Sequence, residues 1–235
     1  MKTMKVFQGT VACRVASDDV FPTPAPPMQD VFAAIQARYQ FVAQPQALGI
    51  QLPGQALTQY AFQGGKFIVD DEAHAIAQLV LEQNGDVITS TSTEVANAIM
   101  DDLAKFLDEK FKYKFHSTPQ TRNFVSTIIV QFDERFEEKI SALRAMIGMV
   151  NAARNSKEDD FQLQRIAFGL GKRPQQPNLF IQQSQIDFVE AAEYALERRT
   201  GVPLSENRYF CSAPLSTADH IRTLEEIERI IASSK

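Results

Sequence analysis

The fold is decided by a stretch that runs Val87-Ile88-Thr89-Ser90-Thr91-Ser92-Thr93-Glu94 and leads into an amphipathic segment ending near Phe111. The apolar, β-branched residues at its start are typical of a strand. A hydroxyl followed three residues later by an acid forms a capping box, which satisfies the free backbone N–H groups at a helix start. The stretch therefore predicts a strand that passes directly into a capped helix.

The same pattern occurs a second time, as Tyr209-Phe210-Cys211-Ser212-Ala213-Pro214-Leu215-Ser216-Thr217-Ala218-Asp219, before a segment that ends near Ile231. We therefore predict an α+β protein with a mostly antiparallel sheet and about four packing helices. It would have two meander-plus-helix halves, residues 1–120 and 121–235, that share one core. The repeat concerns the architecture and not the individual residues.

The remaining strands are read from alternation and turn signals. Gly64-Gly65 predicts a turn within the first meander, and Asn84-Gly85 predicts a hairpin. Residues 40–55 are rich in Gln, Pro and Gly and predict a loop. Further strands are expected over three ranges: 4–16, 124–132 and 161–169.

For two segments the sequence does not decide between strand and helix. Glu72–Gln83 and Ile186–Arg199 both contain good helix formers, with Gly85 and Gly201 as stops. The hairpin signal at Asn84-Gly85 needs a strand partner, and the second half parallels the first. We therefore prefer strand for both segments.

Two further helices are expected, over residues 28–39 and Glu134–Ala153. In the second of these, apolar residues step by four and three, which is the spacing of a packed helix seam. We expect this seam to be buried within the chain or at a subunit contact; its members are Phe136, Ile140, Leu143, Ile147 and Val150.

Composition limits the classes of function. The chain has 235 residues, 44% of them hydrophobic and 23% charged, and a formal net charge of −5. This charge argues against binding of nucleic acid by the protein alone, which needs a basic surface. Because we find no apolar run of membrane-spanning length, no apolar signal segment, and two widely separated thiols, we expect a cytoplasmic protein with no membrane contact.

One pair of residues has the chemistry of a nucleophile and its base. Cys211 lies at the end of a predicted strand, and His220 lies in the first turn of the next helix, with Asp219 or Glu225 as the orienting acid. A helix N-terminus lowers the pKa of a thiol, and a histidine accepts its proton. The structural alternative, which we favour, is that Cys211 is a small buried core residue and that His220 is a surface residue of the first helical turn.

The other motifs are weaker. Val69-Asp70-Asp71-Glu72-Ala73-His74 is similar to a helicase acid box, but no phosphate-binding loop precedes it. A local basic patch for an acidic ligand is the other candidate, formed by Lys172, Arg173, Arg198 and Arg199. The three histidines are dispersed, so no metal site and no cofactor are expected.

These observations favour a non-catalytic binding or adaptor protein, a small subunit of a larger protein assembly. We expect a protein partner, and a homo-oligomer is compatible with the helix seam. The alternatives are a small enzyme that uses Cys211 and His220, or a protein that binds a small ligand.

Overall fold

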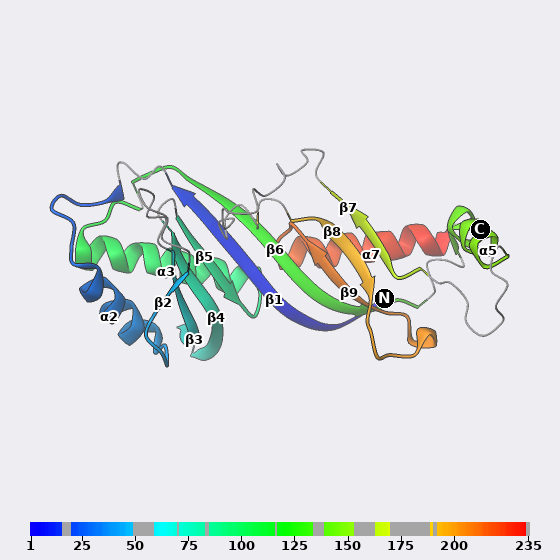
Figure 1. Cartoon of the computed structure of the whole chain (residues 1–235), viewed down its shortest axis with the longest axis horizontal. Helices are drawn as coiled ribbons and strands as arrows, with labels where there is room; N and C mark the ends of the chain where they lie inside the picture. Colours follow the sequence, from blue (N-terminus) through cyan, green and yellow to red (C-terminus); the bar gives the residue numbers. More distant parts are fainter. Residues whose placement is uncertain are drawn as a thin grey trace.

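A computed structural model describes residues 1–15, 20–48, 59–69, 71–82, 85–115, 117–133, 139–152, 163–169, 189 and 192–233. All the strands of this part join one antiparallel nine-stranded sheet, in the order β2-β3-β4-β5-β1-β6-β9-β8-β7 (Figure 1). The α+β prediction is therefore confirmed. The strand bounds are β1 Lys2–Val15, β2 Gln46–Leu48, β3 Gln59–Val69, β4 Glu72–Glu82, β5 Gly85–Ser90, β6 Gln120–Gln131, β7 Arg165–Phe168, β8 Tyr194–Arg198 and β9 Arg208–Ala213.

The sheet is built outward from its two longest neighbours, β1 and β6. These strands pair along their length, from Lys2 opposite Gln131 to Val15 opposite Gln120. On one side of them lie β5, β4 and β3, with the short β2 at the edge, and on the other side lie β9, β8 and β7. In each half the last three strands follow one another inward toward the central pair, and a helix comes next.

Helices α3 (Thr93–Phe111) and α7 (Thr217–Ser233) follow β5 and β9. They lie on one face of the sheet, run in opposite directions and meet at their N-termini near its centre (Figure 1). A cluster of buried residues under α3 includes Ile88, Ile99 and Leu103, and a second cluster under α7 includes Leu224. Among the described helices, none is long and apolar enough to cross a membrane.

Both predicted helix starts are capped by serine. The Ser92 Oγ accepts a hydrogen bond from the Val95 N–H at 3.3 Å, and the Ser216 Oγ accepts one from the Asp219 N–H at 3.1 Å. A side chain on Gly9 of β1 would overlap the backbone of Thr93. Glycine at this position therefore allows the start of α3 to lie directly on the sheet.

The predicted turn at Gly64-Gly65 is wrong. β3 runs through both glycines, and the hairpin to β4 turns beside Asp71, which has a φ of 64°. A Cβ on Gly65 would lie 2.5 Å from the Phe41 ring. The glycine thus makes room for an aromatic side chain and does not turn the chain. The predicted loop over 40–55 also contains a strand, β2.

Both segments for which the sequence did not decide between strand and helix contain strands. β4 covers Glu72–Glu82 and pairs with β5, as the Asn-Gly signal requires. β8 confirms only Tyr194–Arg198 of the second segment. Val189 is helical, and residues 186–188 and 190–191 lie outside the described residues.

The other helices are α2 (Met28–Tyr39), as expected, and α5 (Ser141–Ala152). The predicted burial of the α5 seam within the chain is wrong in part. Leu143 and Ile147 are half-buried, and Val150 is 48% exposed. Phe136 lies outside the described residues, whereas Ile140 packs against the cluster under α7.

Candidate functional site

A pocket of about 240 Å³ lies beside the C-terminal end of α3. Its base is formed by β3, β4 and β5, one side by α2, and another by the chain that follows α3. Four aromatic residues line it together with two acids, and these six residues are Phe21, Tyr60, Tyr113, Phe115, Glu82 and Asp86. An apolar hollow with a few polar groups is the usual form of a small-ligand site.

The acid that distinguishes this pocket is Asp86 of β5. It lies on the same helix-covered face of the sheet as Ile88, two residues further along β5, and is only 7% exposed. Burial, followed by repulsion from Glu82, raises the pKa of Asp86 to about 7. Within the described part of the chain, no ion pair or hydrogen bond to its carboxyl group is present.

The aromatic wall is set by the end of α3. Lys112 adopts a left-handed conformation with φ of 62° and turns the chain back toward the sheet. The Tyr113 and Phe115 rings then stack at 5.6 Å, with an angle of 10° between their planes. Phe21 meets the Tyr113 ring edge-on at 5.5 Å.

Both backbone groups of Phe115 are held by side chains. Its N–H donates to the Asp108 Oδ1 at 2.9 Å, and its carbonyl accepts from the Gln120 Nε2 at 2.8 Å. The Cys13 Sγ donates to the Gln120 Oε1 at 3.5 Å. These bonds join α3, β6 and β1 to the wall of the pocket, so the wall is preorganised.

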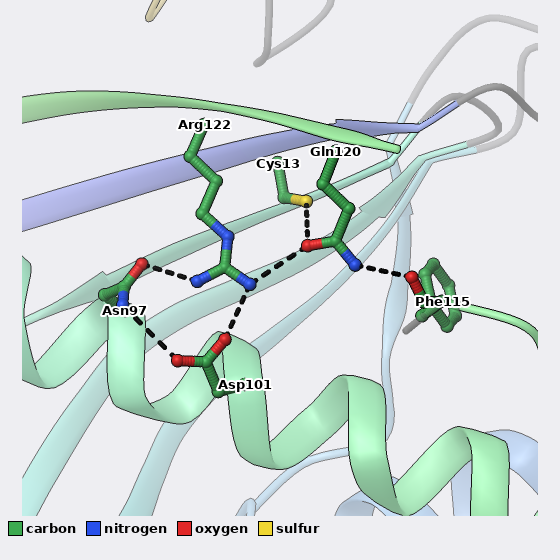
Figure 2. Close-up of polar contacts among 6 residues, drawn as sticks. All are labelled: Cys13, Asn97, Asp101, Phe115, Gln120 and Arg122. Atoms are coloured by element: carbon green, nitrogen blue, oxygen red, sulfur yellow. Dashed lines mark hydrogen bonds and ion pairs between the residues drawn. The ribbon is translucent and has the colours of Figure 1, made fainter. Parts of the chain in front are cut away.

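Figure 2 shows Arg122 reaching from β6 into the same network. Its guanidinium donates to the Asn97 Oδ1 at 2.7 Å, the Asp101 Oδ1 at 2.6 Å and the Gln120 Oε1 at 3.0 Å. Arg122 is thus directed at α3 and Gln120.

Burial and then the charge of Asp86 raise the pKa of Cys13 to about 11, so its thiol is protonated at neutral pH.

The predicted nucleophile and base are both enclosed, so the expected surface position of His220 is wrong: this side chain points from the first turn of α7 into the core. Cys211 and His220 are each 0% exposed, and burial raises the pKa of the Cys211 thiol well above its usual range. The His220 Nδ1 lies 2.7 Å from the Ser126 Oγ, and burial lowers the pKa of His220 to about 4. Its Nε2 has no partner in the described part of the chain. Asp219 faces Arg222, with 2.6 Å between the two charged groups.

The described members of the predicted basic patch lie at another pocket, of about 230 Å³. Arg198 is 5% exposed, donates from Nε to the Leu163 carbonyl at 3.0 Å and stacks over the Tyr209 ring. Arg199 is exposed beside it. Lys172 and Arg173 lie outside the described residues. No group of His, Cys, Asp and Glu suited to a metal ion occurs in the described part.

The Asp86 pocket was missed in the sequence. One signal for it exists, since Asp86 is two residues from the buried Ile88 and so lies on the same face of the strand.

Comparison with protein-family models, curated proteins and solved structures found no match to this chain. The functional argument therefore rests on the geometry of the chain itself.

Proposed function

We propose that this protein is a non-catalytic adaptor that docks to a helix of a partner protein through α5. The observation that carries the proposal is the exposed apolar face of this helix, where Met146 and Met149 are 60% and 71% exposed and Val150 is 48% exposed. Exposed apolar residues gathered on one helix are typical of an interaction surface. Methionine suits such a surface because its flexible side chain adapts to a partner.

The form of α5 favours a helix as the partner. Met146, Met149 and Val150 are spaced i, i+3 and i+4 along α5, so they form one continuous apolar face against which a second helix can pack. Arg144 is the only charged residue of α5 and lies on the side of the helix away from this apolar face, which favours an apolar face on the partner helix. Figure 1 places α5 at the end of the molecule away from α2 and β2.

The buried state of the candidate catalytic residues supports an adaptor over an enzyme. Nucleophilic catalysis by a cysteine needs a thiolate and access for the substrate. Cys211 has a raised pKa and no exposed surface, and His220 is bonded to Ser126.

The test compares the protein with Met149→Asp and with Val42→Asp as a matched control. Val42 is also an exposed apolar residue, 85% accessible, in the loop after α2. Crosslinked complexes should be purified from the producing cells and identified by mass spectrometry. We expect one partner in stoichiometric amount with the wild type and Val42→Asp, and its loss with Met149→Asp.

Recovery of the same partner with all three proteins would refute the proposal, as would the absence of any partner for the wild type. Sedimentation of the purified chain tests whether a second copy of the chain, and not another protein, binds to the apolar face of α5. A dimer that is lost only in Met149→Asp would make α5 a contact between two copies of the chain, in place of a contact with another protein.

A further inference from the structure

The pocket beside α3 combines a buried acid with aromatic walls, and this combination selects one class of ligand. Asp86 is 93% buried, because only 7% of its surface is exposed, yet no described cation or hydrogen-bond donor contacts its carboxyl group. A buried carboxylate without a partner is costly, so the site gains free energy when a cation arrives. This site is independent of the α5 surface.

The groups that face Asp86 do not supply that cation. β4 contributes Glu82, β1 contributes Cys13 opposite Asp86 in the sheet, and the other pocket walls contribute the phenols of Tyr60 and Tyr113. The guanidinium of Arg122, in the neighbouring network, is bonded to Asn97, Asp101 and Gln120. The residues that line the pocket therefore include no lysine or arginine.

The walls favour a cation with an apolar body. The faces of aromatic rings carry negative partial charge and attract ammonium groups. Tyr113 and Phe115 are held in place by stacking and by the bonds to Phe115, so they do not need to reorganise when a ligand enters. A neutral apolar ligand would gain the same contacts with the rings but would remove the remaining water from Asp86 without compensation.

We propose that this pocket binds a small organic cation, a protonated amine whose ammonium group pairs with Asp86 and whose apolar part lies among the rings. The volume of about 240 Å³ sets the size of the ligand. A cavity of about 150 Å³ holds benzene, so this pocket accommodates an aromatic ring with a short aminoalkyl chain.

The test is isothermal titration calorimetry with 2-phenylethylammonium and with its neutral analogue 2-phenylethanol, near pH 8. The ammonium should bind one to one, and about tenfold or more tighter than the alcohol, because only the ammonium pairs with the carboxylate. Asp86→Asn should weaken binding of the ammonium by about tenfold or more and should remove the preference between the two probes. Glu109→Gln, which removes an exposed carboxylate from α3 outside the pocket, should bind like the wild type.

The position of the site is tested by Met28→Trp. Met28 lines the pocket and is 42% exposed, so a larger side chain there blocks the entrance without disturbing the core. This variant should lose binding of the ammonium even if Asp86→Asn fails to fold. Between about pH 6 and about pH 8 the wild type should bind the ammonium more tightly as Asp86 ionises, since an alkylammonium with a pKa near 10 stays charged.

Three results would overturn the proposal: no saturable binding of the ammonium by the wild type up to about 10 mM, equal affinity for the ammonium and the alcohol, or unchanged binding in Met28→Trp. A variant of Asp86 that folds and binds the ammonium with full affinity would do the same.

Discussion

Thr93 and Thr217 exchange hydrogen bonds at the point where α3 and α7 begin. The Thr217 N–H donates to the Thr93 Oγ1 at 2.6 Å, and the Thr93 N–H donates to the Thr217 Oγ1 at 3.0 Å. The two positive ends of the helix dipoles therefore face one another, which is unfavourable by itself. Glu94 compensates in part, because its carboxylate accepts a hydrogen bond from the Ala218 N–H at 3.2 Å. Burial alone would raise the pKa of Glu94, but bonds from backbone N–H groups lower it.

This reciprocal pair should couple the two halves of the sheet energetically. Thr93→Val or Thr217→Val keeps the shape of the side chain but leaves a buried N–H of the other helix unpaired, which costs about 1–3 kcal/mol. The double variant should cost less than the sum of the single ones by at least about 0.5 kcal/mol. Urea unfolding of the four proteins measures this coupling. Thr223→Val, which removes only a bond to the Asp219 carbonyl within α7, serves as the control. Strict additivity would show that the two threonines do not act as a unit.

The two serine caps have a purely structural role in our interpretation. Ser92→Ala and Ser216→Ala should each lower the free energy of unfolding by about 0.5–2 kcal/mol, because each leaves a backbone N–H of the first turn without its partner. Thermal unfolding followed by circular dichroism measures the loss. Ser233→Ala, at the C-terminal end of α7, removes a bond to the Arg229 carbonyl and should change little. A cap variant of full stability that loses binding of a partner would instead assign a function to the cap.

Local patterns predicted the elements well, because their causes are local. The cap at Ser92 and the apolar face that includes Ile99 are enough to specify α3, and its bounds agree with the sequence. The turn predicted at Gly64-Gly65 was wrong because Gly65 makes room for the ring of Phe41, which comes from another part of the chain. The seam of α5 is only partly buried within the chain, because its spacing indicates an apolar face and does not determine what covers that face.

The pocket could not be predicted for the same physical reason. Its walls come from Phe21, Tyr60, Asp86 and Tyr113, which only the order of the strands and the turn after α3 bring together. Cys211 and His220 show the converse case. Their order along the chain suggested a reactive pair, but the inward alternation of β9 and the inward face of α7 bury both side chains.

The exposure of α5 changes the stability expected of its variants. Leu224 of α7 is 0% exposed, so Leu224→Ala should cost about 2–5 kcal/mol. Leu143 of α5 is only half-buried, and Leu143→Ala should cost clearly less, about 1 kcal/mol. Chemical unfolding of both variants gives the comparison. An equal and large loss for Leu143→Ala would mean that α5 is covered, as in a stable oligomer, and repeating the measurement at several protein concentrations identifies that case.

The last prediction concerns the pH dependence of stability, where Asp86 and His220 act in opposite directions. The pKa of Asp86 is raised to about 7 in the folded protein, so the folded state holds a proton that the unfolded state releases near pH 4. The contribution of Asp86 is therefore complete below about pH 4 and is lost as the pH rises toward about 7. The pKa of His220 is lowered to about 4 by burial, so its contribution is complete above about pH 6.5 and is lost as the pH falls.

The two effects nearly cancel between about pH 4 and about pH 6.5 in the wild type, since each amounts to about 1.4 kcal/mol per pH unit with opposite sign. Asp86→Asn removes one of them. Its stability should rise with pH in this range, match the wild type near pH 4 and exceed it near pH 8 by up to roughly 4 kcal/mol, the free energy that corresponds to the raised pKa. Urea unfolding at these pH values measures the difference, with Glu109→Gln expected to follow the wild type. A gap between Asp86→Asn and the wild type that stays constant with pH would show that Asp86 is ionised in the folded protein throughout this range.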